Sequence, residues 1–399
     1  MDSPSPSLLR SVRFWNGVAA LGLLVLSLWM AAADFRFSGH FILQSSWSTV
    51  FLGLWLSAWT LAAVIFAGFS KRFVLLALLL ATLRFSFGWP LLERFDLRFS
   101  CLLLDGLLVA LALVYLVLTA LAKKGFVARP WFRWQHSALM GVAWLGSSLL
   151  SLPLGILGFA KVIDQTSRGY VRLTPQGISL TERIFEKDGR KVHLFGMAHI
   201  AEGDFYEALH QHLAQPLPGG RLVLTEGVHD KNRILPASFA SGSTYREMAE
   251  ALGLKEQKHF GSKTDQSTGV ESPWEEEWKK LGVTFLPADI DVSELSPEHQ
   301  EQLVQLLSAL DGLNLASIFS NPGDLSSSEL EELIVEGLVK QRNARLMEVF
   351  LAEYRNYAEV FIPWGAAHLP DLEQRLLALG YLPIAESSRL GIDFWKRWR

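Results

Sequence analysis

Cysteine is nearly absent from the sequence, because Cys101 is the only one among 399 residues. No intrachain disulfide can form, which excludes a small extracellular domain that depends on disulfides for stability. The sequence also contains no Gly-x-Ser-x-Gly nucleophile motif, no His-Glu-x-x-His zinc motif and no glycine-rich phosphate-binding loop. These absences argue against the common serine hydrolases, zincins and nucleotide-binding enzymes.

Charged residues are scarce in the first 160 residues, which hold 12 Lys and Arg and 5 Asp and Glu. The remaining residues hold 25 Lys and Arg and 35 Asp and Glu, so the two parts carry net charges of about +7 and −10. A chain divided in this way indicates two solvents, lipid for the first part and water for the second. The acidic second part argues against a nucleic-acid partner, because phosphates require a basic surface.

Five segments are long and apolar enough to span a membrane, which requires about 20 mostly apolar residues in a helix. The third is the weakest, because Arg84 lies inside it and Gly88 and Pro90 interrupt its end. The five predicted spans are residues 14–33, 50–69, 73–92, 101–121 and 137–160. The sequence therefore predicts a bundle of about five transmembrane helices in residues 1–160, followed by a soluble α/β domain in residues 161–399.

Basic residues between the spans predict the orientation of the chain. They precede span 1, lie between spans 2 and 3, and lie between spans 4 and 5: Arg10, Arg13, Lys71, Arg72, Lys123, Lys124, Arg129 and Arg133. The positive-inside rule assigns these loops to the cytoplasm, which requires one passage at each of the five spans. We therefore expect a multi-pass protein of the bacterial inner (cytoplasmic) membrane. Its N-terminus would be cytoplasmic and its C-terminal domain periplasmic or extracellular, with membrane lipid as a partner.

Two features of the membrane part have alternative interpretations. The first span resembles a signal peptide with Ala31-Ala32-Ala33 as a cleavage site, although its length favours an uncleaved anchor. Arg84 and Asp105 are charges inside predicted spans, and they form either a structural ion pair or part of a polar pathway. Neither alternative changes the side of the membrane on which the soluble domain is expected.

The second part of the sequence alternates strand-like and helical segments. An Asp188-Gly189 turn joins the strands 178–186 and 191–195 in a hairpin. Further strands are expected at residues 171–174, 221–225, 283–286, 359–363 and 381–385, with helices at 204–214, 244–252, 274–280, 297–310, 327–354 and 370–379. Residues 255–273 are polar and are expected to form a loop. This alternation predicts an α/β fold with a mixed, partly parallel sheet.

Polar residues follow four of the predicted strands: His199, Glu226, Asp289 with Asp291, and His368. In α/β sheets, ligands bind beyond the carboxyl ends of the strands. Gly196-x-x-His199 and Gly365-x-x-His368 repeat one short pattern, in which glycine allows a tight turn before the histidine. Two imidazoles and a carboxylate suit a divalent metal with an open position for water, and a spare carboxylate would serve as general base.

Each of these residues also has a structural interpretation. A histidine at the end of a strand is commonly a hydrogen-bonded structural residue, and Glu226 alone could cap a helix. Asp289 and Asp291 lie on opposite sides of an extended segment, so at most one should face a site, and Asp291 could begin the turn before the next helix. Arg342 and Arg345, one helical turn apart, form either a solvated face or an oxyanion clamp. The other histidines of the second part show no ligand spacing.

Three segments of this part resemble the TraB/PrgY/GumN family, which includes the Tiki proteases. The first is Gly196-Met-Ala-His199, followed by Leu222-Val-Leu-Thr-Glu226. The second is Gln341-Arg342-Asn343-Ala344-Arg345-Leu346-Met347, similar to the Arg-Asn helix of the family. The third is Trp364-Gly365-Ala366-Ala367-His368-Leu369-Pro370, followed by Leu379-Gly380-Tyr381. The sequence departs from the family pattern at Gln341, where glutamate is common, and at Asp371, where glycine is common.

This resemblance implies a Tiki/TraB-like fold, shared more widely with ChaN-like haem-binding proteins and erythromycin esterases. It implies a divalent metal, with Mn, Co or Zn all suitable, held by His199, Glu226 and His368 and less certainly by Asp289. Glu226, Arg342 and Asn343 would be the catalytic and supporting residues. The implied activity is a metal-dependent hydrolase acting on a peptide or protein substrate outside the membrane.

Two other function classes remain open on the sequence alone. The same pocket could belong to a non-catalytic binding or regulatory protein that holds a peptide, a signal or haem. A transporter is a weaker alternative that would depend on Arg84 or Asp105. The sequence specifies neither the substrate nor the oligomeric state.

Overall fold

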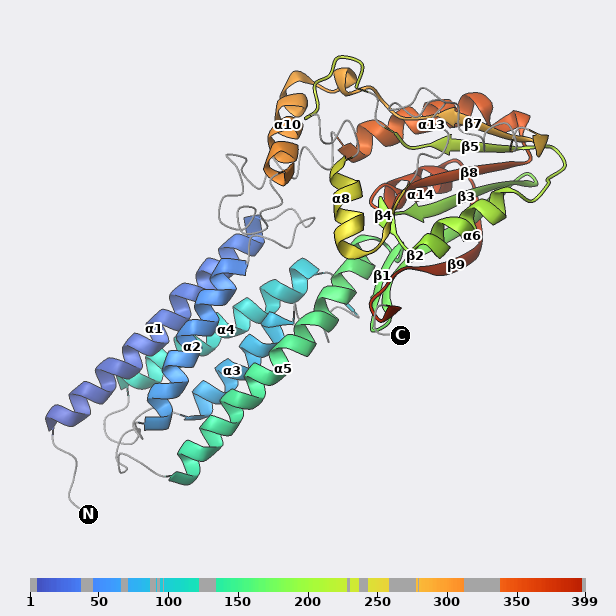
Figure 1. The fold of residues 1–399 in the computed structure, drawn as a ribbon. Coiled ribbons are helices and arrows are strands. Elements are labelled where there is room, and N and C mark those ends of the chain that lie inside the picture. Colours follow the sequence, from blue (N-terminus) through green and yellow to red (C-terminus); the bar gives the residue numbers. More distant parts are fainter. Residues whose placement is uncertain are drawn as a thin grey trace. The chain divides into compact units, whose positions relative to one another are not determined.

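The chain divides into two compact units, Met1–Gln165 and Thr166–Arg399. The computed structural model describes residues 6–36, 46–65, 71–86, 91, 94–95, 97–121, 134–227, 230–236, 243–257, 278, 280–311 and 338–396. The first unit is helical, and the second is built around a mixed sheet (Figure 1). Their border lies at the end of helix α5, Trp134–Thr166, which continues past the expected border at residue 160.

The helical unit contains α1 (Pro6–Arg36), α2 (Ser46–Ile65), α3 (Lys71–Phe85), α4 (Leu97–Leu121) and α5. Three stretches are long and apolar enough to cross a membrane: Arg13–Ala32, Phe99–Leu121 and Ser137–Thr166. The described apolar stretch of α2 is shorter, Phe51–Ala63, and α3 has 15 residues. The unit therefore carries candidate membrane helices, as expected, while the number of five spans stays a prediction.

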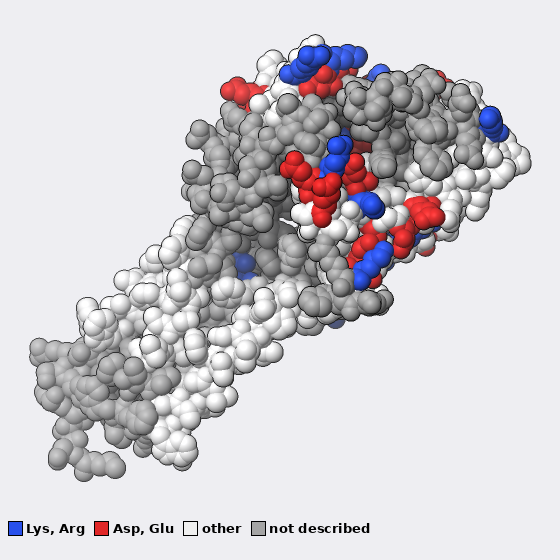
Figure 2. Space-filling model, viewed as in Figure 1, with Lys and Arg blue, Asp and Glu red and all other residues white. Residues whose placement is uncertain are grey.

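Apolar side chains cover the outside of these helices, and polar groups pair inside. Leu152 and Leu121 are 72% and 70% exposed, and the described surface of the helices in Figure 2 is almost free of charge. An apolar exterior of this extent suits lipid rather than water. Inside the unit, Arg84 Nε donates to Asp105 Oδ1 at 2.9 Å, and both side chains are fully buried. These two charges therefore form the ion pair that was one of the two expectations.

The second unit has a seven-stranded sheet in the order β1-β2-β3-β8-β5-β7, with β9 on the other side of β2. The strands are β1 (Val171–Thr174), β2 (Gly177–Lys187), β3 (Arg190–Met197), β5 (Arg221–Thr225), β7 (Val283–Pro287), β8 (Glu359–Gly365) and β9 (Leu382–Asp393). β3, β8, β5 and β7 are parallel, whereas β1, β2 and β9 pair in antiparallel fashion. The prediction of a mixed α/β sheet is confirmed. The Tiki/TraB-like fold stays a prediction.

Local chemistry explains the register of the first hairpin. Asp188 and Gly189 both have positive φ angles, 50° and 74°, as the two central residues of a type I′ turn require. This turn pairs Lys187 with Arg190, and the same register places Ile184 opposite His193. Side chains two residues apart on one strand share a face, so Glu182 lies on the same face as Ile184. Directly paired residues also share a face, so Glu182 and His193 point to the same side of the sheet.

Apolar strands and two groups of helices form the core of the second unit. β5 and β8 are buried along almost their whole length, as parallel strands covered on both faces are. α6 (Gly203–Leu213) packs on the face that carries Phe195 and Phe361. On the other face, the guanidinium of Arg342, at the start of α13 (Arg342–Glu353), lies over the ring of Trp364. α14 (Leu369–Ala378) follows β8.

Most predicted elements of this unit agree with the structure within a few residues, including α8 (Ser243–Leu252) and α10 (Pro297–Asp311). The last strand is longer than expected, because β9 continues to Asp393 along the edge of β2. Residues 258–277 and 312–337 lie outside the described residues. They include most of the expected loop 255–273, most of the expected helix 274–280 and the start of the expected helix 327–354.

Candidate functional site

The carboxyl ends of four neighbouring parallel strands carry the polar residues that the sequence singles out. In the sheet order β3-β8-β5-β7, these ends lead to His199, His368, Glu226 and Asp289. Parallel strands end at the same edge of a sheet, so the four side chains are drawn from the same edge. We call these four residues and Arg342, which joins them from α13, the strand-end cluster.

Arg342 is the centre of the strand-end cluster. Its Nε donates to Asp289 Oδ1 at 2.9 Å and its Nη2 to Asp289 Oδ2 at 2.7 Å, a bidentate pair. Nη2 also donates to Glu226 Oε1 at 2.8 Å. The side chains of Arg342, Glu226 and Asp289 are 12%, 9% and 0% exposed. Burial would raise the pKa of Asp289, but the hydrogen bonds and charge of Arg342 lower it, so the carboxylate is ionised.

His368 accepts a hydrogen bond from the same guanidinium. Its Nδ1 lies 2.8 Å from Asn343 Oδ1 and its Nε2 lies 3.2 Å from Arg342 Nη1. Since an amide oxygen only accepts and a guanidinium only donates, the proton is on Nδ1 and the ring is neutral. Burial lowers the pKa of His368 to about 4, and the charge of Arg342 acts in the same direction. Asn343 Nδ2 donates to the carbonyl oxygen of His368 and to Asp371, which fixes the orientation of the amide.

The backbone of Gly365 contacts the carboxylate of Glu226. The Gly365 N–H donates to Glu226 Oε2 at 2.5 Å, and a Cβ at this position would lie 3.4 Å from the same oxygen. That distance is an ordinary van der Waals contact, so the space beside Glu226 does not by itself require glycine, and the role of glycine in the Gly-x-x-His pattern stays a prediction. Burial would raise the pKa of Glu226, but the nearby charge of Arg342 and this hydrogen bond lower it. Glu226 is therefore an ionised carboxylate in a largely buried position.

His199 is the accessible member of the strand-end cluster. The residue is exposed, and its ring stacks on Tyr245 at a centroid distance of 4.5 Å. Reduced hydration lowers the pKa of His199, Glu226 opposes this effect, and Arg342 adds to it. His199 is thus close enough to both charges to respond to them and is neutral at pH 7.

The strand-end cluster has the kinds of donor atom that a divalent metal binds, but these atoms already contact a guanidinium. The ionised carboxylate of Glu226 and the lone pair on His368 Nε2 are suitable ligands, and Asn343 orients the imidazole as an outer-sphere partner does. However, Arg342 donates to both of these donor atoms, which lie 3.7 Å apart. A cation already holds the ligands that a metal would need, so the metal role of His199, Glu226, Asp289 and His368 stays a prediction.

Two residues considered with the strand-end cluster have other partners. Asp291 Oδ1 accepts from the Ser293 N–H at 3.0 Å and caps a short 3-10 turn (Val292–Glu294), which is the alternative that the sequence left open for it. Arg345 is exposed and pairs with Glu348 at 3.1 Å. Arg342 and Arg345 therefore form neither a shared solvated face nor a shared clamp.

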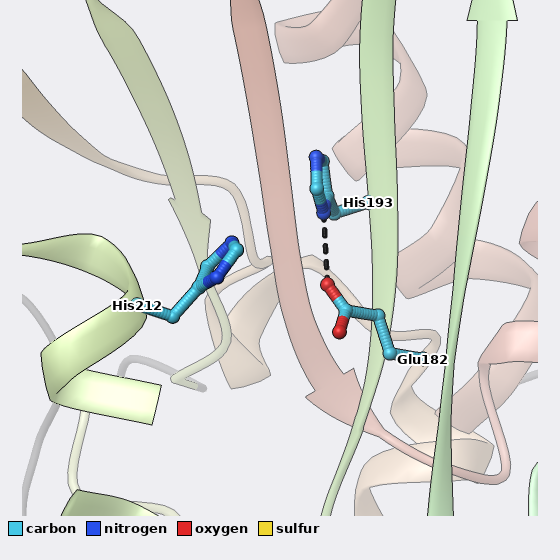
Figure 3. A group of neighbouring side chains, drawn as sticks. All are labelled: Glu182, His193 and His212. Carbon is cyan, nitrogen blue, oxygen red and sulfur yellow. Dashed lines mark hydrogen bonds and ion pairs between the residues drawn. The ribbon is translucent and has the colours of Figure 1, made fainter. Parts of the chain in front are cut away.

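A second polar group lies on the α6 side of the sheet, and sequence spacing missed it. Glu182 on β2, His193 on β3 and His212 on α6 each offer one ligand atom within 4.8 Å of the other two (Figure 3). Among the described residues, this Glu/His/His group is the one that could hold a metal ion. The register of the hairpin would have predicted that Glu182 and His193 lie on one face of the sheet. His212 comes close to them only because α6 packs on that face, which the sequence spacing does not predict.

Comparisons with protein-family models, with curated proteins and with solved structures found no match for the chain. The resemblance to the TraB/PrgY/GumN family therefore stays a prediction from the motifs.

Proposed function

We propose that the chain is a membrane-anchored hydrolase and that it cleaves peptide bonds at the strand-end cluster. The observation that carries the proposal is the meeting of a guanidinium, an ionised carboxylate and an accessible neutral imidazole at the carboxyl ends of β3, β8 and β5. Acyl hydrolysis requires a base for the attacking water and a positive group for the developing oxyanion. The strand-end cluster contains both.

His199 is the residue best suited to accept the proton of the water. Its ring is neutral and accessible, and the charge of Glu226 favours the imidazolium that forms when the proton arrives. Arg342 is suited to the oxyanion, because its hydrogen bonds within the strand-end cluster use four of its five N–H groups. Among the residues that the structure describes, the fifth, on Nη1, has no partner, and it is suited to the carbonyl oxygen of a substrate. Asp289 and Asn343 position Arg342 and His368.

No step of this scheme uses the divalent metal that the resemblance implies, because Arg342 occupies its donor atoms. The basic residues between the apolar segments support a domain outside the cytoplasmic membrane of a bacterium, where extended peptides are accessible substrates. The implied substrate is a peptide or protein segment, held near His199 and Tyr245.

The test is hydrolysis of a fluorogenic peptide library by the full chain in mild detergent. We expect wild-type turnover, at least a hundredfold loss with His199→Ala or Arg342→Lys, and unchanged turnover with Arg345→Lys, a matched exposed control on the same helix. Chelation should leave the activity intact. Turnover equal in wild type and His199→Ala would refute this scheme, and binding of peptides without turnover would support the non-catalytic alternative.

A further inference from the structure

Glu182, His193 and His212 lie away from the strand-end cluster. His193 stands four residues before Met197, the last residue of β3, which corresponds to roughly 13 Å of strand. His212 is in the last turn of α6, the helix that returns from the carboxyl end of β3 to the start of β5. The group therefore belongs to the opposite half of the sheet and takes no part in the proposed hydrolysis.

The donor atoms of this group converge in a protected place. Glu182 and His193 have side chains that are 5% and 3% exposed, and Oε1 of the first lies 2.8 Å from Nδ1 of the second. His212 lies beside them, with a ring centroid 5.6 Å from that of His193. Its Nε2 is buried and has no hydrogen-bond partner among the described residues. A buried ring nitrogen without a partner is costly, which indicates that something binds there.

Neighbouring groups orient the two donors from β2 and β3. On the far side of the His193 ring, Nε2 lies at an ion-pair distance of 3.1 Å from Glu359 Oε1, although without hydrogen-bond geometry. Glu359 is in turn held by Arg221 at 2.8 Å. The second oxygen of Glu182 accepts from Ser387 Oγ at 3.2 Å. A histidine whose other nitrogen faces a carboxylate, and a carboxylate whose other oxygen is hydrogen-bonded, are typical of metal-binding sites.

We propose that Glu182, His193 and His212 bind one zinc ion that fastens α6 to the sheet. Two imidazoles and one carboxylate oxygen are ligands that Zn²⁺ prefers, at distances of about 2.0–2.2 Å. The ion takes the place of the proton that His193 Nδ1 shares with Glu182, and this proton is released to solvent. His193 then keeps its Nε2 proton toward Glu359. His212 Nε2 gains the partner that it lacks, and a water molecule completes the tetrahedron.

Zinc content of the full chain in detergent tests this proposal. The protein is treated with chelator, equilibrated with Zn²⁺, desalted and analysed for metal per chain. We expect His212→Ala and the near-isosteric Glu182→Gln each to bind one zinc fewer than wild type. His210→Ala is the matched control, because this residue is on the same helix but packs against Trp278. It should bind as much zinc as wild type, as should His199→Ala and His368→Ala.

Thermal unfolding gives a second readout that does not depend on activity. Zinc at about a hundredfold excess over its dissociation constant should raise the unfolding midpoint of wild type by roughly 5–10 °C, and that of His212→Ala by much less. Circular dichroism checks that each variant is folded, and Glu182→Gln replaces His212→Ala if the latter is not. Equal zinc in wild type and both variants would overturn the proposal. Loss of zinc in His368→Ala with retention in Glu182→Gln would also overturn it, because the ion would then belong to the strand-end cluster.

Discussion

The helical unit and the α/β unit each bury an arginine against a carboxylate, but the surroundings differ. In the helical unit, Arg84 and Asp105 are 1% and 0% exposed, and buried apolar residues such as Ala81 and Leu104 are close to them in the sequence. In the α/β unit, Arg342 binds two carboxylates and an imidazole beside the accessible ring of His199. The first pair lies within a unit whose core is apolar, whereas the second belongs to a group that is open to a ligand.

The comparison shows that a buried charge alone does not make a site. The desolvation cost of a buried ion pair can exceed its Coulombic gain, so the burial of two opposite charges is not by itself evidence of a functional site. The strand-end cluster has one carboxylate more than its guanidinium neutralises, and it has an imidazole that solvent can reach. The contact between Arg84 and Asp105 therefore fits the structural interpretation of these charges better than a transport pathway does.

Removing one partner of the helical pair should have the largest effect on stability. Arg84→Met leaves Asp105 as an uncompensated buried carboxylate, so we expect a loss of about 3–5 kcal/mol. Arg84→Met/Asp105→Leu should recover most of it, because no charge remains. Unfolding in mild detergent measures both. A double variant as unstable as the single one would show that the pair contributes more than charge neutralisation.

In the α/β unit, Asp289→Asn should weaken the attachment of Arg342 by removing the charge from its bidentate partner. We expect a loss of about 2–3 kcal/mol in the free energy of unfolding, together with loss of peptide hydrolysis. Asp291→Asn, two residues away, changes the cap of a short turn and a long hydrogen bond from the Lys231 N–H at 3.4 Å, so a loss of about 1 kcal/mol or less with full activity is expected. Equal effects of the two variants would contradict the assignment of Asp289 to the strand-end cluster.

The sequence predicted the parts of this arrangement that depend on local pattern. Alternating strands and helices, and a polar residue after each of four strands, were sufficient to bring Glu226, Asp289 and His368 together. The resemblance named Arg342 as a supporting residue, but its contacts with Asp289, Glu226 and His368 together were not predicted, because they depend on how α13 packs over Trp364. His212 was missed for the same reason, since its partners are 19 and 30 residues away in the sequence and meet it only through the packing of α6.

Two buried histidines should give opposite pH dependences in chelator-treated protein. The pKa of His368 is lowered to about 4 in the folded state, so it should contribute stability above pH 6.5 that is lost as the pH falls toward 4. The pKa of His193 is raised by Glu182 and Glu359 although burial opposes this, so its contribution should be present below pH 6.5 and lost as the pH rises through the folded value.

A change on the order of 1–2 kcal/mol is expected from His368, and a change of opposite pH dependence from His193. Chemical denaturation between pH 5 and 9 measures them. His368→Gln should flatten the acidic side of the profile, and His193→Gln the alkaline side. The same flattening in both variants would contradict the opposite directions of the two pKa shifts.

The smallest effect is expected at Arg345, one turn from Arg342 on α13. Its guanidinium is 49% exposed and its partner Glu348 is 69% exposed, so solvent screens the pair. Arg345→Ala should change the free energy of unfolding by less than about 0.5 kcal/mol and leave hydrolysis unchanged. A clear loss of hydrolysis would mean that substrate reaches the exposed side of α13, and the proposed site would then have to extend from the strand-end cluster to this face.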